Sequence, residues 1–134
     1  MSEIKVNKIN PVSTNDIVET GSATSSSVVL LTNSSSGIDL DCSLSNCYEI
    51  GIGSTTATQE QNATLNNPTN AMAGYTGTIF IDVLTNFQTI TFESNWKFPN
   101  GTVPELGAPG TQSRIDFVVD NSSNVHAQVT NTIS

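Results

Sequence analysis

Basic residues are scarce in this chain of 134 residues: Lys and Arg total 4, against 12 Asp and Glu, so the formal net charge is -8. A chain with this charge repels phosphate backbones, because nucleic-acid binding relies on Lys and Arg to neutralise phosphates. We therefore expect no direct nucleic-acid partner. Long apolar runs are also missing, and none approaches the roughly 20 residues of a membrane-spanning helix. A membrane partner is not expected either.

The residue types that carry catalysis and metal binding are few. The chain has one histidine, His126, and two cysteines, Cys42 and Cys47. Zinc needs more ligands of these types than the chain offers. His126 follows Val125 in an alternating stretch, so we expect it on the solvated face of a strand, and no spacing of Ser, His and Asp indicates a catalytic triad. We therefore assign no catalytic residue, no metal site and no cofactor.

The two cysteines leave two alternatives open. Cys42 and Cys47 are separated by SLSN, which fits a four-residue hairpin loop that would bring the side chains close enough for a disulfide. The N-terminus, MSEIKVNKIN, lacks the uninterrupted apolar stretch of a secretory signal. We therefore expect synthesis in the cytoplasm, where disulfides are rare, and favour two thiols over a disulfide.

Half of the 12 acidic residues are aspartates, and several of these fall on expected strands. Asp39, Asp41, Asp82, Asp116 and Asp120 could gather around a hard cation such as calcium. Neither an EF-hand loop nor a nonapeptide calcium repeat occurs in the sequence, so we favour solvated carboxylates.

Alternating apolar residues predict strands along most of the chain. Patterns with a period of two occur near residues 37–41, 47–53, 77–84, 90–92, 115–119 and 125–129. The continuous apolar run VVLL predicts a further strand at 28–32, and a short pair, Ala63 and Leu65, could add a brief strand. We expect the strands at 77–84 and 90–92 to be antiparallel neighbours. About eight short strands and no helical spacing predict an all-β domain over residues 28–134, an antiparallel β-sandwich or a jelly-roll-like barrel.

The first 27 residues have a different composition from the rest. Ile4 and Val6 alternate with polar residues, Ile9 and Pro11 follow, and the segment ends in GSATSSS. So little apolar surface cannot offset the entropy lost on ordering. We predict an extended N-terminal arm over residues 1–27 that orders on a partner, with Ile4, Val6, Ile9 and Pro11 as its contacts.

The most turn-rich part of the chain is WKFPNGTVPELGAPGTQSRIDFVV, residues 96–119. Pro99, Asn100 and Gly101 fit a tight turn, which we expect to be a hairpin that Trp96 and Phe98 enter. The two prolines of PELGAPG cannot donate to a ladder, so this part should form a surface loop or the rim of a sheet.

The aromatic residues allow two interpretations. Trp96, Phe98, Tyr75 and Phe117 could form a sugar-binding platform, but aromatic residues are only 6% of the chain, and a domain of this size needs large side chains in its core. We favour the core. Trp96, together with Asn100 and Glu105 from the loop region, is kept as a candidate contact for a glycan or for a neighbouring subunit at the rim.

The order of these features resembles a β domain of tailed-bacteriophage virion proteins. The corresponding stretches are IDLDCSLSNCYEIGI, LNNPTNAMAGYTGTIFIDV and QTITFESNWKFPNGTVPELGAPGTQSRIDFVVDNSSNVHAQV, and SEIKVNKINPVS is similar to the opening of many phage fibre and appendage proteins. The resemblance is strongest where an aromatic pair, a glycine, a Pro-x-Leu segment and an Asp within an apolar strand follow one another. One departure is LSN after the first Asp strand, where the family usually has a turn with glycine.

The resemblance implies a non-enzymatic virion protein made in the bacterial host cytoplasm. The shortness of the chain and its acidity favour a capsid decoration, or cement, protein on the outer surface of the head. Its partners would be the major capsid protein and copies of itself, as a trimer, with the arm laid across neighbouring subunits. The alternative is a tail-fibre or appendage component that binds a host receptor or surface glycan. A hydrolase is the least favoured hypothesis.

Overall fold

The computed structural model describes residues 27–53 and 62–133. These residues form strands joined by turns, and no α-helix occurs among them, so the predicted all-β class is confirmed. The strands are β2 (Val29–Leu30), β3 (Cys47–Ile52), β4 (Asn62–Leu65), β5 (Thr76–Val83), β6 (Thr89–Phe92), β7 (Trp96–Lys97), β8 (Gln112–Val119) and β9 (Val125–Ile133), with a 3-10 turn, η2, at Pro99–Gly101. The predicted arm contacts Ile4, Val6, Ile9 and Pro11 lie outside the described residues.

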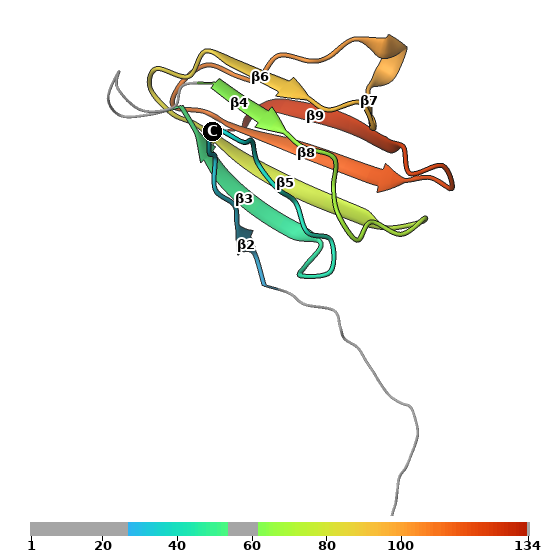
Figure 1. Cartoon of the computed structure of the whole chain (residues 1–134). Helices are drawn as coiled ribbons and strands as arrows, with labels where there is room; N and C mark the ends of the chain where they lie inside the picture. Colours follow the sequence, from blue (N-terminus) through green and yellow to red (C-terminus); the bar gives the residue numbers. More distant parts are fainter. Residues whose placement is uncertain (1–26, 54–61, 134) are drawn as a thin grey trace, which may run out of the picture.

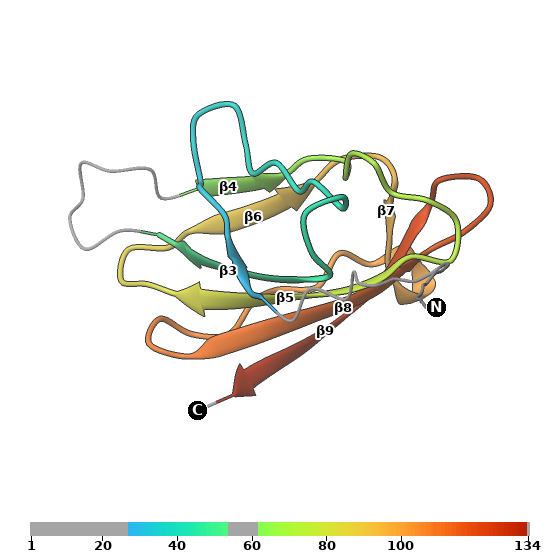
Figure 2. The same cartoon turned by 90° about the horizontal axis from the view of Figure 1, so that it is seen from below.

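Six strands form one large sheet in the order β2-β3-β5-β8-β9-β7, and β4 and β6 form a second, smaller sheet. The smaller sheet lies over one face of the larger one (Figures 1 and 2). Among the described strands only β5 with β8 and β8 with β9 pair antiparallel, whereas the other four pairs are parallel. The expected antiparallel arrangement is therefore wrong. Between β3 and β5 the chain passes through β4 in the other sheet, and such a crossover returns a strand parallel to the first.

The predicted pairing of the strands at 77–84 and 90–92 is also wrong. β5 pairs with β3 and β8, and β6 pairs with β4 in the smaller sheet. A turn between Leu84 and Phe87, with Asn86 at a φ of 68°, carries the chain from one sheet to the other. Two alternating strands close in sequence can therefore lie in different layers.

The strand expected at 37–41 is present only as isolated bridges. Ile38 pairs with Leu65 and Asp41 pairs with Thr69, both in the parallel sense. The amide of Ile38 donates to the carbonyl of Thr64 at 2.7 Å. This segment thus covers the edge of β4 that β6 leaves free.

One core lies between the two sheets. Alternate residues of β5, from Gly77 to Val83, are buried, and β3 and β8 show the same alternation. The smaller sheet contributes Ala63 and Leu65, with Ile38 and Leu40 beside them. The period of two in the sequence thus correctly identified the buried face of each long strand.

Glycine at position 77 is required by a close contact. A Cβ built on Gly77 would lie 2.5 Å from the Phe117 ring, which covers it from the neighbouring strand. The same ring packs edge-on against Trp96 at a centroid distance of 5.3 Å. Gly77 therefore makes room for the aromatic cluster at this end of the core.

Candidate functional site

A hollow of about 670 Å³ lies over strands β5, β8 and β9 and is bordered by β7 and η2. Its side-chain lining comes mainly from the residues that alternate with the core, so it opens on the face of the large sheet that points away from the smaller sheet. Pro99 and Lys97 close one side, and Asn46 closes another. We refer to it as the outer hollow.

Two rows of side chains, set by strand register, cross the outer hollow. One row joins Thr78, Asp116 and Gln128. The next row joins Thr76, Val118 and His126, and it continues through the pairing of β7 with β9 to Lys97. Directly opposed side chains on a sheet lie about 5 Å apart, so each row presents adjacent polar groups to the solvent.

Asp116 is the central acceptor of the first row. The hydroxyl of Thr78 donates to Asp116 Oδ1 at 2.9 Å, and Arg114 Nε donates to Asp116 Oδ2 at 2.9 Å. Both members of the Arg114–Asp116 ion pair are more than 40% exposed. An exposed pair of this kind contributes little to stability, and of its two members only Asp116 lines the outer hollow.

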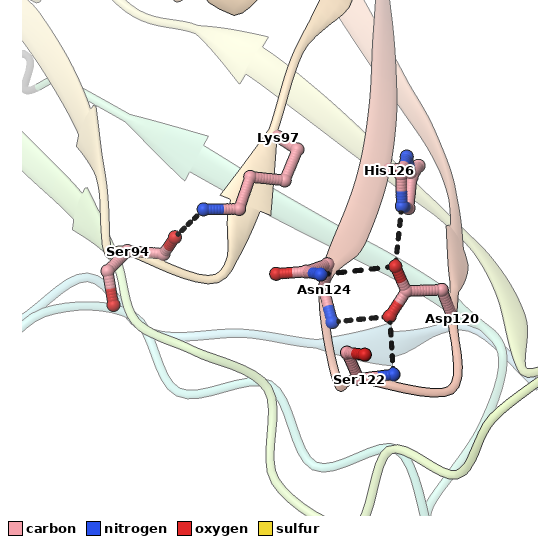
Figure 3. A network of polar contacts seen from close by, with 6 residues as sticks. All are labelled: Ser94, Lys97, Asp120, Ser122, Asn124 and His126. Carbon is pink, nitrogen blue, oxygen red and sulfur yellow. Dashed lines mark hydrogen bonds and ion pairs between the residues drawn. The ribbon is translucent and has the colours of Figure 1, made fainter.

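Asp120 and His126 form a second polar cluster at the hairpin between β8 and β9 (Figure 3). His126 Nε2 lies 2.8 Å from Asp120 Oδ2. The backbone amides of Ser122 and Asn124 donate to Asp120 Oδ1 at 2.8 and 2.9 Å, and Asn124 Nδ2 donates to Oδ2. The hydrogen bond with His126, followed by those from Asn124 and Ser122, lowers the pKa of Asp120.

His126 is exposed, as predicted, but its carboxylate partner was not foreseen. The signal was present in the stretch DNSSNVH, because Asp followed by Ser and Asn accepts amide hydrogen bonds in a tight turn. In a hairpin the residues on either side of such a turn are neighbours, so Asp120 and His126 could have been paired. The cluster fixes the His126 ring at the edge of the outer hollow.

The three predicted contact residues Trp96, Asn100 and Glu105 are not brought together. Trp96 is only 5% exposed, and its Nε1 donates to the carbonyl of Asn66 at 3.0 Å. The surface contact proposed for Trp96 is therefore wrong, and the core interpretation that we favoured is confirmed. Asn100 and Glu105 are both exposed, the first in η2 and the second in the following segment.

The other aromatic residues considered for a sugar platform also belong to the core. Phe98 and Phe117 are buried, and Tyr75 packs against Phe117 at a ring-centroid distance of 5.8 Å. The predicted turn at Pro99–Gly101 is present, with positive φ at Asn100 and Gly101. The predicted hairpin is not, because Trp96 and Lys97 pair in parallel with β9 instead of with the residues after the turn.

Both cysteines are free thiols. Cys42 is buried near the hydroxyls of Tyr48 and Tyr75, and burial raises the pKa of the Cys42 thiol and of both phenols. A thiol whose pKa is raised by burial is a poor nucleophile and a poor metal ligand. The two tyrosine hydroxyls contact each other and the carbonyl of Ser45, and so they fix the loop before β3.

The aspartates considered for calcium have separate partners. Asp41 accepts hydrogen bonds from Asn70 and Ser43, which lower its pKa, and Asp39 accepts one from Asn66. Asp82 accepts one from Gln112. Within residues 27–53 and 62–133, no three His, Cys, Asp or Glu side chains are grouped so as to hold a metal ion.

A second concave feature lies beside β6. It has a volume of about 470 Å³, and its walls are β6 with the residues before it and segment 103–107. The apolar members of its lining are Phe87, Ile90, Val103, Pro104 and Leu106, and Glu105 is its charged member. We refer to it as the edge groove.

In comparisons with known proteins, no family model matches the chain, and neither a curated protein nor a solved structure matches it significantly. The part of the chain that the structure describes contains no helix of the length and apolarity needed to span a membrane. The resemblance to phage virion domains therefore remains a prediction from the sequence.

Proposed function

We propose that the chain is a non-enzymatic structural protein of a tailed-bacteriophage virion, a decoration protein on the outside of the head. The observation that carries this proposal is the charge of the folded part. Eight of the twelve acidic residues but only two of the four basic residues, Lys97 and Arg114, lie in the described ranges. Packaged DNA would repel such a surface, so an exterior position is favoured.

The fold is compatible with this role. We assign it as a β-sandwich-like domain, because two sheets enclose one core in a short chain. A rigid small domain suits a repeated shell component, and the predicted arm at residues 1–27 would link it to neighbouring subunits. The partners in this proposal are the major capsid protein and two further copies of the chain.

The direct test is an image reconstruction of particles of the phage that encodes the chain. We expect density for the domain on the outer head surface. A companion test uses a variant that lacks residues 1–20, which should keep its circular-dichroism spectrum and melting temperature but should no longer bind expanded shells. Undiminished binding of the truncated protein would show that the arm is not the attachment device.

The outer hollow supports a second candidate function, recognition of a host surface glycan by a tail appendage. Asp116, Gln128, His126 and Thr78 present donors and acceptors in adjacent rows, beside the exposed apolar side chain of Val118. Sugar sites combine a few placed polar groups with apolar surface in this way. If this function is right, the double variant Asp116→Ala/Gln128→Ala should lose binding to host polysaccharide and keep its fold, whereas unchanged binding would exclude the hollow.

A further inference from the structure

We propose that the edge groove is the acceptor for residues 3–9 of a second copy of this chain, which would add a strand beside β6. The inference deepens the proposed function, since that function makes the arm a contact device without assigning it a docking place. It rests on four observations: the open edge of β6, the lining of the groove, the sequence of residues 3–9, and the distribution of charge.

The first observation is the open edge. Among the described strands β6 pairs only with β4. The hydroxyl and amide contacts of Thr91 and Glu93 with Ala63 and Leu65 are all made on that side. Because successive residues of a strand direct their backbone groups to opposite edges, the groups of Ile90 and Phe92 point away from β4. Over its four residues this edge could pair along about 13 Å.

The other edges of the fold are less suited to adding a strand. β2 and β7 are two residues long, and Pro99 follows β7 closely. Short strands and prolines are common ways to block edge pairing. β9 extends beyond its pairing with β7, but its exposed side chains there are polar, as at Gln128 and Thr130. β6 combines an open edge with the sequence TITF and an adjacent groove in which five of the nine lining residues are apolar.

The lining of the groove matches the alternation of residues 3–9. In the sequence EIKVNKI, an extended conformation places Ile4 and Val6 on one face, with Lys8 following them at the end of that face. The groove offers Ile90 from β6 and Val103 and Leu106 from the opposite wall. Val103 is 51% exposed in the single chain, so an added strand would bury apolar surface that is now in contact with water.

Charge favours the same occupant. Lys5 and Lys8 are half of the basic residues of the whole chain and lie within this short segment. The groove carries Glu105, which is exposed, on a domain in which acidic residues outnumber basic ones by eight to two. Opposite charges guide an approaching segment and fix its register. Added strands bind through backbone hydrogen bonds, with side-chain alternation supplying specificity.

The first experiment measures self-association of the full chain by sedimentation velocity over a range of concentrations. We expect oligomers that Val6→Asp and Val103→Asp each weaken by about tenfold or more, since about 1.4 kcal/mol corresponds to a factor of ten. Leu30→Asp, at a site 78% exposed on β2, is the matched control and should leave association unchanged. A chain that stays monomeric, or one dissociated only by Leu30→Asp, would overturn the proposal.

Two further measurements identify the pairing. Lys5→Glu/Lys8→Glu should weaken association, and combining it with Glu105→Lys should restore it. In a mixture of Val6→Cys chains and Val103→Cys chains, we expect a disulfide-linked dimer under mild oxidation. If a chain carrying both substitutions forms the bond only within itself, the second copy is not the occupant.

Hydrogen exchange locates the added strand. The amides of Ile90 and Phe92, which face away from β4, should become protected as the concentration rises, whereas new protection at 127–133 instead would assign the contact to β9 and contradict the proposal. Self-association is measured on the isolated chain, and the location on the virion is measured on particles. The groove assignment can therefore fail while the head location holds, and the reverse is also distinguishable.

Discussion

The outer hollow and the edge groove differ in how the fold builds them. The outer hollow lies on the face of three strands that are paired on both sides, so continuous backbone ladders fix its side-chain rows. The edge groove lies between a segment containing Pro104 and the side of β6 that pairs with no other strand among the described residues. A sheet face whose strands are hydrogen-bonded on both sides can hold polar groups at fixed spacings for a small ligand. An open edge offers backbone hydrogen bonds to another chain.

The two regions also differ in chemistry. The outer hollow carries a carboxylate, an ammonium group, an imidazole and several hydroxyl and amide groups, whereas five of the nine residues that line the groove are apolar and Glu105 is its one charged residue. Substitutions in the hollow should therefore change ligand binding without changing assembly. Substitutions in the groove should change assembly without changing ligand binding.

The largest expected effect is on stability and comes from Trp96, which packs between β6 and the strands that carry the outer hollow. Its ring packs against Phe92 of β6 and against Phe117 below the hollow. Trp96→Ala should lower the free energy of unfolding by about 3–5 kcal/mol, the range for deleting a buried aromatic ring. Chemical denaturation measures this loss. Trp96→Phe is the control and should cost much less, because it keeps a ring in the core; equal costs would mean that the ring is not packed as described.

A smaller loss is expected at the floor of the outer hollow. Gly77→Ala places a methyl group against the Phe117 ring and should cost about 1–3 kcal/mol, as overpacking does in other cores. Gly74→Ala serves as a comparison, because a Cβ there meets no atom within 4 Å although its φ is positive. A Gly77→Ala protein as stable as the wild type would contradict the close packing beneath the hollow.

A pH-dependent effect is expected from Asp120. Because its pKa is lower in the folded chain, its stabilising effect is present above the unfolded value of about 3.9 and is lost as the pH falls through the folded value. Asp120→Asn should therefore melt at a lower temperature than the wild type at pH 6, and the difference should shrink below pH 4. His126→Gln removes the hydrogen bond that contributes most to the lowered pKa of Asp120. This variant should also melt at a lower temperature than the wild type at pH 6, by a smaller amount, and the difference should again shrink below pH 4. A difference in melting temperature that stays the same from pH 6 to below pH 4 would contradict the lowered pKa of Asp120.

The smallest stability effect is expected on the polar rows of the hollow. Asp116→Ala/Gln128→Ala should change the free energy of unfolding by no more than about 0.5 kcal/mol per site, as is usual for exposed positions. Sedimentation should show the same association as the wild type. If this variant associated more weakly than the wild type, the outer hollow would also take part in assembly, and the two regions would not differ in function.

The sequence predicted the strands well and their partners poorly. Alternation identified the buried face of β5 and β8, because burial on one face of a strand leaves a period of two in the sequence. It could not show that β5 and β6 lie in different sheets, since pairing depends on where the chain crosses between layers. The turn at Pro99–Gly101 was predictable from its residues, whereas the return of β7 to pair in parallel with β9 was not.

The candidate site was less predictable than the fold. Trp96 was considered for the surface because aromatic residues serve both cores and binding sites, and only its burial decides between them. The row of Thr78, Asp116 and Gln128 depends on the register of three strands far apart in the sequence. The edge groove depends on an unpaired edge, which no residue pattern reveals.

The central claim, a decoration protein on the head, is tested most directly by locating and counting the chain in particles of the phage that encodes it. The account predicts hundreds of copies on the outer head surface, seen by image reconstruction and confirmed by quantitative mass spectrometry. A few copies confined to the tail would contradict it and would favour the glycan-binding appendage instead.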